Sequence, residues 1–300
     1  MDESPHSAAV SQGSEHHRRL AGLKDPSVAD RLMVDGFARL GPFLTPQECD
    51  HLRDTFDEIM TNCDVPVGDE WFPTILLQNE EARAGLSRVL AGILGPKLDT
   101  VFHGDQWDEV RLDFSVKPPT ERSELGPHQD YSMVDEDRFA SLYVWVPLID
   151  TSFGNGTLHV VRGSHRFANK IRSRTVPALF DDVLPAVRDA GTRLDCVAGE
   201  LIIMVAGVIH FSPPNLSGHL RLAAHGVFTP RGAPLVHYLV DADTPTGSVE
   251  CFEVEGIDRF VRLIHDGRPD DLGSPQRIMP LPPARMTAER LAAGLDAVQQ

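Results

Sequence analysis

The hydrophobic period of this sequence changes after residue 96, and that change constrains the fold more than any other feature. Before it the pattern is helical. Thr45, Pro46 and Glu48 form a helix start with a capping box, and residues 80–94 predict a second helix that a Gly-Pro pair ends. After it come short β-rich runs punctuated by Gly and Pro, at 108–119, 140–150, 156–163, 200–207 and 221–230. Helices followed by short strands predict an antiparallel sandwich or barrel with helices packed on one outer face.

We expect a single folded domain, because the chain shows neither an internal repeat nor a linker between independent units. A strand is predicted at 36–44 and a further helix within 176–191. The division that we expect is a disordered tail at 1–24, one domain at 25–300, a β core at about 97–230, an insertion at about 166–195 and a C-terminal extension at 231–300.

Composition excludes several classes of function. The net charge of −16 and the pI near 5.2 argue against a nucleic-acid surface, which needs basic patches. No run approaches the roughly 18 apolar residues of a membrane span, so no membrane partner is expected. The polar N-terminal stretch lacks the apolar segment of a secretory signal, and four separated cysteines fit a reduced compartment. We therefore expect a cytoplasmic protein.

A candidate metal site begins at the stretch GPHQDYS, where His128 and Asp130 flank Gln129. Such a pair needs a further ligand from a distant part of the fold. Among the thirteen histidines, His210 is the best candidate because it ends an apolar strand. Two histidines and one carboxylate match the facial triad of non-heme Fe(II) oxygenases, which leaves coordination positions open. A structural zinc site would close its tetrahedron instead.

Arg221 opens the next apolar strand, eleven residues after His210 (221 − 210). An arginine that points into a barrel is costly unless a carboxylate meets it. Its planar guanidinium also suits bidentate recognition of a carboxylate. The triad and this arginine together predict a site for a 2-oxo acid and O₂.

Four pieces of the chain resemble the phytanoyl-CoA dioxygenase (PhyH) family of Fe(II)/2-oxoglutarate-dependent oxygenases, in the family's order and spacing: GPHQDYS, YVWVPLIDTSFGNGTLHVVRGSH, GELIIMVAGVIHFSPPNLSGHLR and DGFARLGPFLTPQECDHLRDTF. The resemblance covers about residues 28–230. It implies a mainly β fold with flanking helices, in which a double-stranded β-helix (jelly-roll, cupin-like) core carries helices on one face. It implies a dioxygenase, an oxidoreductase whose cofactors are Fe(II), 2-oxoglutarate and O₂.

The resemblance also implies roles for particular residues. The implied iron ligands are His128, Asp130 and His210. Arg221, with Ser212 beside it, is implied as the anchor of the C5 carboxylate of 2-oxoglutarate. Trp145 falls where similar proteins set an aromatic side chain against the co-substrate, although a tryptophan in an apolar strand also suits a core position. From our own interpretation of the segment before the β core, Gln78 or Asn79 reaches the C1 carboxylate.

The expected reaction is hydroxylation, desaturation or cyclisation at a C–H bond of a small metabolite, with release of succinate and CO₂. Because related halogenases lack the carboxylate, Asp130 argues against halogenation. The acidic composition gives no support for a CoA thioester, so we expect a substrate from bacterial secondary metabolism. Two alternatives stay open. One is a cupin-like metalloenzyme that does not use 2-oxoglutarate, and the other is a non-catalytic jelly-roll binding module.

Overall fold

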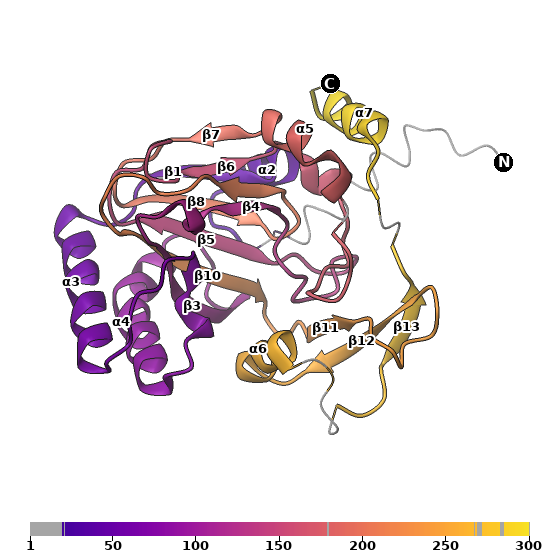
Figure 1. The fold of residues 1–300 in the computed structure, drawn as a ribbon, viewed down its shortest axis with the longest axis horizontal. Helices are drawn as coiled ribbons and strands as arrows, with labels where there is room; N and C mark the ends of the chain where they lie inside the picture. The colour runs from indigo at the N-terminus through magenta and orange to yellow at the C-terminus, as the bar shows by residue number, and fades with distance from the viewer. Residues whose placement is uncertain are drawn as a thin grey trace.

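Two antiparallel sheets form the centre of the computed structural model (Figure 1). The larger sheet has the order β1-β8-β5-β10-β3-β2 and the smaller one β4-β9-β6-β7. The strands of the larger sheet are β1 (Phe37–Pro42), β2 (Phe72–Pro73), β3 (Trp107–Lys117), β5 (Leu142–Pro147), β8 (Glu200–Val205) and β10 (Arg221–Pro230). Those of the smaller sheet are β4 (Leu125–His128), β6 (Leu158–Val160), β7 (Thr192–Leu194) and β9 (His210–Ser212). The structure describes residues 20, 22–178, 180–266, 268, 272–282 and 285–299.

Three helices cover the outer face of the larger sheet, which confirms the predicted jelly-roll with helices on one face. They are α2 (Pro26–Asp35), α3 (Pro46–Asn62) and α4 (Glu80–Leu98). Alternate residues of each strand point outward, so Leu112 and Phe114 of β3 join the same buried cluster as Phe56 of α3 and Leu90 of α4. The Phe56 and Phe114 rings lie 5.3 Å apart. Thr45 caps α3 in the predicted capping box.

Two predicted helices have different bounds in the structure. Helix α4 does not end at residue 94 but continues through Pro96 to Leu98. A proline in the last turn removes only one intrahelical hydrogen bond, and burial of Leu98 favours the extra turn. The helix predicted within 176–191 reduces to a 3-10 turn, η4 (Asp181–Val183), and to α5 (Leu184–Asp189). The other 3-10 turns are η1 (Thr74–Leu76), η2 (Glu121–Ser123) and η3 (Ser164–Arg166).

The β core reaches further back than the predicted start near residue 97. Strand β1 pairs with β8 at the edge of the larger sheet, and β2 pairs with β3. The end of the predicted insertion forms β7, which pairs with β6. Leu20 and Leu23 are buried, so packed chain begins before the predicted boundary at residue 25. Most of the predicted tail lies outside the described residues.

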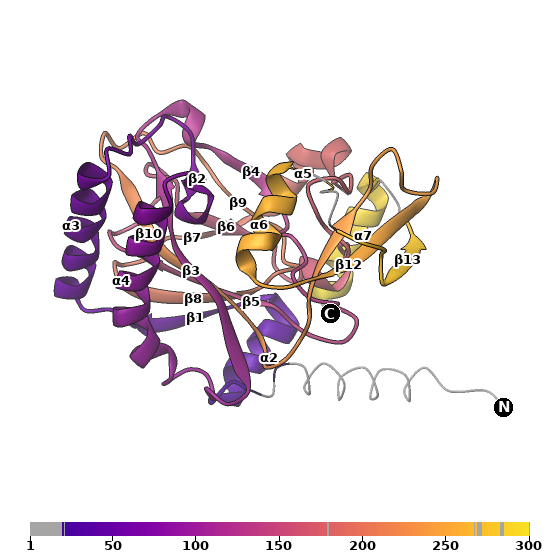
Figure 2. The ribbon, with the colours of Figure 1, turned by 90° about the horizontal axis from the view of Figure 1, so that it is seen from below.

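The C-terminal extension forms a third, small sheet with two helices. Its elements are β11 (Leu235–Leu239), β12 (Ser248–Val254), α6 (Ile257–Asp266), β13 (Arg277–Pro280) and α7 (Ala288–Gln299). In Figures 1 and 2 this sheet lies on the side of the molecule opposite α3 and α4. Phe260 and Leu263 of α6 share a buried cluster with Met133 and Tyr143, so the extension packs against the barrel. Over the described residues, every helix is too short or too polar to cross a membrane.

His237 makes the stability of the fold depend on pH. This residue of β11 is 2% exposed, and its ring meets Phe260 edge-on at 5.6 Å. Burial lowers the pKa of His237 to about 4. The unfolded chain, with the ordinary pKa of 6.5, therefore binds a proton more readily than the folded chain between those values, and the fold loses stability as pH falls through that window.

We expect this single group to remove about 3 kcal/mol from the free energy of unfolding between pH 7 and pH 4. A His237→Gln variant cannot make that contribution, so its stability should fall less steeply with acid. Urea denaturation of both proteins at pH 7, 5.5 and 4 measures the difference. Parallel pH profiles of the two proteins would show that His237 titrates normally in the fold.

Candidate functional site

The pairing of β4 with β9 brings two distant histidines together. His128 lies directly opposite His210 in the register, and Asp130 follows two residues later. His128 Nε2 lies 3.8 Å from Asp130 Oδ1, and His210 Nε2 lies 3.7 Å from Asp130 Oδ2. One ligand atom from each residue can be chosen so that all three lie within 4.8 Å of one another. In the described part of the chain this is the one such group of three or more histidine, cysteine or acidic side chains.

Backbone contacts orient both imidazoles toward the shared carboxylate. His128 Nδ1 lies 2.9 Å from the Gly126 carbonyl, and His210 Nδ1 lies 3.1 Å from the Val208 carbonyl. These carbonyls hold the proton on Nδ1, so that the Nε2 lone pair of each ring is free to bind a metal shared with Asp130. Burial, followed by the neighbouring His210, lowers the pKa of His128 to about 4, which keeps its ring neutral. Although burial raises the pKa of Asp130, His210 and His128 hold it below its usual value.

Gln129, between two members of the triad, points away from it. Its Nε2 donates to the Asn169 carbonyl at 3.0 Å and to the Gly207 carbonyl at 2.6 Å. An extended tripeptide turns its middle side chain to the opposite face, as predicted for this residue. Gln129 therefore ties the triad to the insertion on one side and to the turn before β9 on the other.

Arg221 is a buried cation in the cavity that the triad lines. Arg221 is 2% exposed, and its Nε and Nη1 have no hydrogen-bond partner among the described residues. Burial lowers the pKa of Arg221 to about 9. The guanidinium carbon lies 5.6 Å from the centre of the Trp145 ring, and Ser212 lines the same cavity. An unpaired buried guanidinium is costly, so this arrangement fits a carboxylate ligand.

Lys117 lies opposite Arg221 in the β3–β10 pair and was not foreseen from the sequence. It is fully buried, and its Nζ donates to the Ser123 carbonyl at 2.5 Å and to the Pro213 carbonyl at 2.9 Å. These bonds join the loop before β4 to the loop after β9. Burial, with the charge of Arg221, lowers the pKa of Lys117 to about 6. The residue thus fixes both chain segments that carry the triad.

The structure does not bring Gln78 to this cavity. Its side chain is exposed and is absent from the cavity lining. Asn79, the other residue considered, is the N-cap of α4, where its Oδ1 accepts a hydrogen bond from the Ala82 amide at 2.9 Å. This cap holds the chain so that Gln78 faces solvent. Trp71, earlier in the same segment, lines the cavity instead, and its Nε1 donates to Ser115 Oγ at 2.9 Å.

Arg111, Ser115 and His225 line the cavity but were missed, although a signal for the first two exists in the sequence. Arg111, Asp113, Ser115 and Lys117 are polar residues that alternate with apolar ones in the second half of β3. Such alternation predicts a strand with one polar face directed into the barrel. His225 lies on the neighbouring strand directly opposite Asp113. Arg111 and His225 line the cavity together with the triad.

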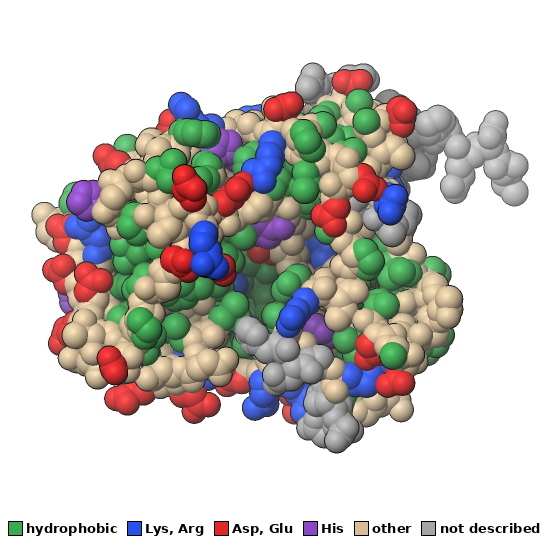
Figure 3. Space-filling model, viewed as in Figure 1, with side chains coloured by type: hydrophobic (Ala, Val, Ile, Leu, Met, Phe, Trp, Pro, Cys, Tyr) green, Lys and Arg blue, Asp and Glu red, His purple; other side chains and the backbone are tan. Residues whose placement is uncertain are grey.

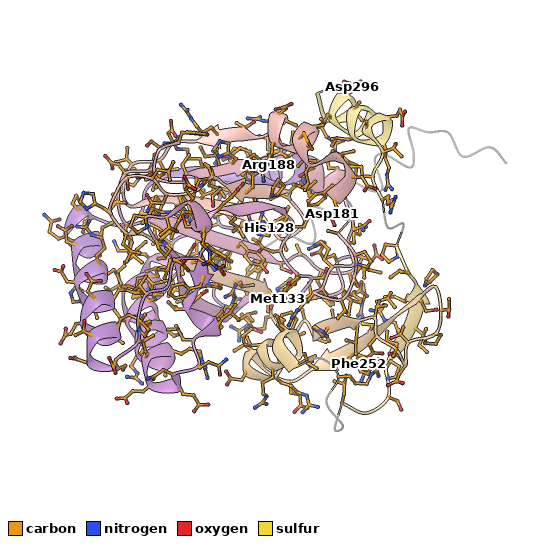
Figure 4. The ribbon with its side chains drawn as sticks, viewed as in Figure 1. His128, Met133, Asp181, Arg188, Phe252 and Asp296 are labelled. Atoms are coloured by element: carbon orange, nitrogen blue, oxygen red, sulfur yellow. The ribbon has the colours of Figure 1, made fainter. Side chains whose placement is uncertain are left out.

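Two cavities meet at His128. The inner one, of about 70 Å³, holds the triad and Arg221. The outer one, of about 280 Å³, lies between His128, Tyr131 and the insertion, including Ile171 and Phe180. Figure 3 shows this face of the molecule hollowed between the barrel and the C-terminal extension. Figure 4 labels His128 in the barrel, Asp181 of the insertion to its right and Met133 below it, toward the extension.

Comparison with known proteins gives one family. The model of the phytanoyl-CoA dioxygenase (PhyH) family matches residues 32–223. A curated relative, a phytanoyl-CoA dioxygenase of Arabidopsis thaliana, is 32% identical over 115 residues, which are 37% of this chain and 40% of the relative. The aligned part thus spans two fifths of that relative.

Several solved structures match this chain at low identity and with TM-scores below 0.5. The α-ketoglutarate-dependent carbocyclase SnoK from nogalamycin biosynthesis is 18% identical, with 85% of this chain and 95% of that chain covered and a TM-score of 0.47. EvdO2 from Micromonospora carbonacea var. aurantiaca is 19% identical, with 74% of this chain and 95% of that chain covered and a TM-score of 0.49. EctD from S. alaskensis with bound Fe is 18% identical, with 70% of this chain and 78% of that chain covered and a TM-score of 0.48. Values this low transfer no property to the present chain.

Proposed function

This chain belongs to the phytanoyl-CoA dioxygenase family of Fe(II)- and 2-oxoglutarate-dependent oxygenases, and on that premise we propose that it oxidises a C–H bond of a small metabolite. The reaction that we propose is a hydroxylation, or a desaturation or cyclisation, in bacterial secondary metabolism. The observation that carries the proposal is the coincidence of two features in one cavity. These are a triad of metal-ligating side chains and a buried arginine without a partner among the described residues.

The donor set of the triad fits iron(II). Two neutral imidazoles and one carboxylate on one face suit Fe(II) and leave coordination positions open, whereas a tetrahedral structural site would fill them. His128, Asp130 and His210 would hold the metal. Bound there, iron would supply the redox chemistry that couples decarboxylation of 2-oxoglutarate by O₂ to oxidation of a substrate C–H bond, with release of succinate and CO₂.

The chain's own residues bind and orient the co-substrate. Arg221 offers two unpaired N–H groups to the C5 carboxylate, and the indole of Trp145 limits where the guanidinium can lie. Ser212 lines the cavity beside it. Because the barrel walls bury Arg221, few waters compete for its hydrogen bonds, and the interaction is stronger than in water.

Asp130 supports oxidation in preference to halogenation, since a carboxylate occupies the third ligand position. The alternative of a cupin-like metalloenzyme that does not use 2-oxoglutarate leaves Arg221 without a function. A non-catalytic binding module leaves the triad without one. Of the three hypotheses, only a 2-oxoglutarate-dependent oxygenase uses both the triad and Arg221.

Calorimetric titration of the Ni(II)-loaded protein tests the proposal, because nickel occupies such sites without turning over. We expect 2-oxoglutarate to bind, and glutarate to bind at least about tenfold more weakly, since glutarate lacks the 2-oxo group that chelates a metal. Metal-free protein should lose this preference. Equal binding of the two acids by loaded protein would contradict a 2-oxoglutarate site.

A further inference from the structure

A second basic group lies in the same cavity, far along the strands from Arg221. In the register of β3 with β10, Arg221 is opposite Lys117. Arg111 precedes Lys117 by six residues on β3 (117 − 111) and is opposite Val227. At about 3.3 Å per residue the two arginines are separated by about 20 Å of strand. Both line the cavity of the triad, and they enter it from well-separated positions on the two strands.

Asp113 holds this second group in place. The carboxylate is 2% exposed, and its Oδ1 lies 3.0 Å from Arg111 Nη1 and 3.0 Å from His225 Nδ1. A buried carboxylate that contacts both side chains restricts their rotamers before any ligand arrives. Such pre-ordering is a property of binding sites, because the ordering entropy is then not lost on binding.

The donors of Arg111 are largely unused. Its side chain is 14% exposed, and within the described residues its polar contact is the ion pair with Asp113. Nη1 is buried and makes no hydrogen bond of good geometry there. A guanidinium carries five N–H donors, so donors remain for a ligand. Among the described residues, Asp113 is the carboxylate in direct contact with Arg111 and His225, and Asp130 interacts with both at longer range.

The geometry points to a carboxylate on the primary substrate as the group that Arg111 binds. This inference rests on the proposed function, in which Arg221 serves the co-substrate. The planar guanidinium accepts a carboxylate through two parallel hydrogen bonds. A substrate carboxylate would also use the Arg111 donors that the contact with Asp113 leaves free. The substrate class that we assign is therefore a small carboxylic acid, held by Arg111 while its C–H bond faces the triad.

Matched acid and amide probes test this assignment. The probes are benzoate with benzamide, phenylacetate with phenylacetamide, and cyclohexanecarboxylate with its amide, titrated calorimetrically into Ni(II)-loaded protein saturated with 2-oxoglutarate. We expect at least one acid to bind about tenfold or more tightly than its amide. In Arg111→Gln the affinity for that acid should fall by roughly 10- to 100-fold, the effect of losing a charge-assisted hydrogen bond, with the amide unchanged.

Two variants separate recognition from a merely structural effect. Arg111→Lys keeps the positive charge but lacks the planar guanidinium that makes two parallel hydrogen bonds, so it should retain part of the preference for the acid. Arg193→Gln is the matched control, because Arg193 is 54% exposed and pairs with Asp195 outside the cavity lining. This control should bind the probes as the unmodified protein does.

Three results would overturn the assignment: no acid binds, acid and amide bind equally, or Arg111→Gln binds the acid normally. Loss of 2-oxoglutarate binding in Arg111→Gln would also overturn it, since Arg111 would then serve the co-substrate and the proposed function would stand. Failure of the unmodified protein to bind 2-oxoglutarate would overturn the assignment and the proposed function together.

Discussion

We expect His210→Ala to lose its Fe(II) site. His210 supplies one of three ligand atoms, and its ring is already fixed by the Val208 carbonyl 3.1 Å from Nδ1. Removing an outer partner of a metal ligand weakens metal binding about 10- to 100-fold, and removing a ligand itself should exceed that. Anaerobic equilibrium dialysis against Fe(II) measures the loss directly.

His159→Ala is the matched control for this experiment. His159 lies on the neighbouring strand β6, is 8% exposed, and contacts the carbonyl two residues before it, Thr157, as His210 contacts Val208. Its ring stacks on Phe211 and is absent from the cavity lining. This control should keep the full affinity for Fe(II). Comparable iron binding by both variants would remove His210 from the metal site.

We expect Arg221→Met to lose 2-oxoglutarate while the empty protein becomes more stable. Each charge-assisted hydrogen bond contributes about 1.5–3 kcal/mol, so loss of two lowers the affinity for 2-oxoglutarate by on the order of 10²- to 10⁴-fold. In the absence of a carboxylate, however, the buried guanidinium is a cost, which the lowered pKa of about 9 also reflects. A methionine of similar length removes that cost, and the free energy of unfolding should rise by about 1–4 kcal/mol.

Calorimetry on Ni(II)-loaded protein measures the affinity for 2-oxoglutarate, and urea denaturation of the metal-free protein measures the free energy of unfolding. Nickel affinity should not change, because Arg221 is not a member of the triad. Arg193→Met controls for the loss of a surface arginine and should alter neither quantity. Unchanged 2-oxoglutarate affinity in Arg221→Met would show that the co-substrate carboxylate binds elsewhere. A less stable variant would mean that Arg221 contributes to the fold itself.

The triad could be predicted because its members carry local signals. His128 and Asp130 share a short extended segment, His210 follows an apolar run and Arg221 opens the next one. In the structure His210 begins β9 and does not end β8, contrary to the prediction, because β8 stops at Val205. What the pattern alone lacks is the register. The direct opposition of His128 and His210 depends on pairing between strands about eighty residues apart (210 − 128), which local periodicity does not determine.

Other features depended on contacts that a sequence pattern does not contain. Lys117 acts through backbone carbonyls, and any residue supplies a carbonyl, so no side-chain motif marks its partners. Gln78 lies outside the cavity lining, in a segment with few local constraints, where Asn79 next to it caps α4. Strand β1 was predicted as a strand, but its membership of the core depends on β8, about 160 residues later.

The measurement that tests the central claim most directly is an anaerobic titration of metal-free protein with Fe(II) and then with 2-oxoglutarate, followed by visible absorption. A weak charge-transfer band, characteristic of a 2-oxo acid chelated to Fe(II), should appear only when both are present. It should weaken in Arg221→Met and be absent in His210→Ala. If folded, iron-loaded protein gives no band with 2-oxoglutarate, the co-substrate does not chelate at this triad and the proposed function is wrong.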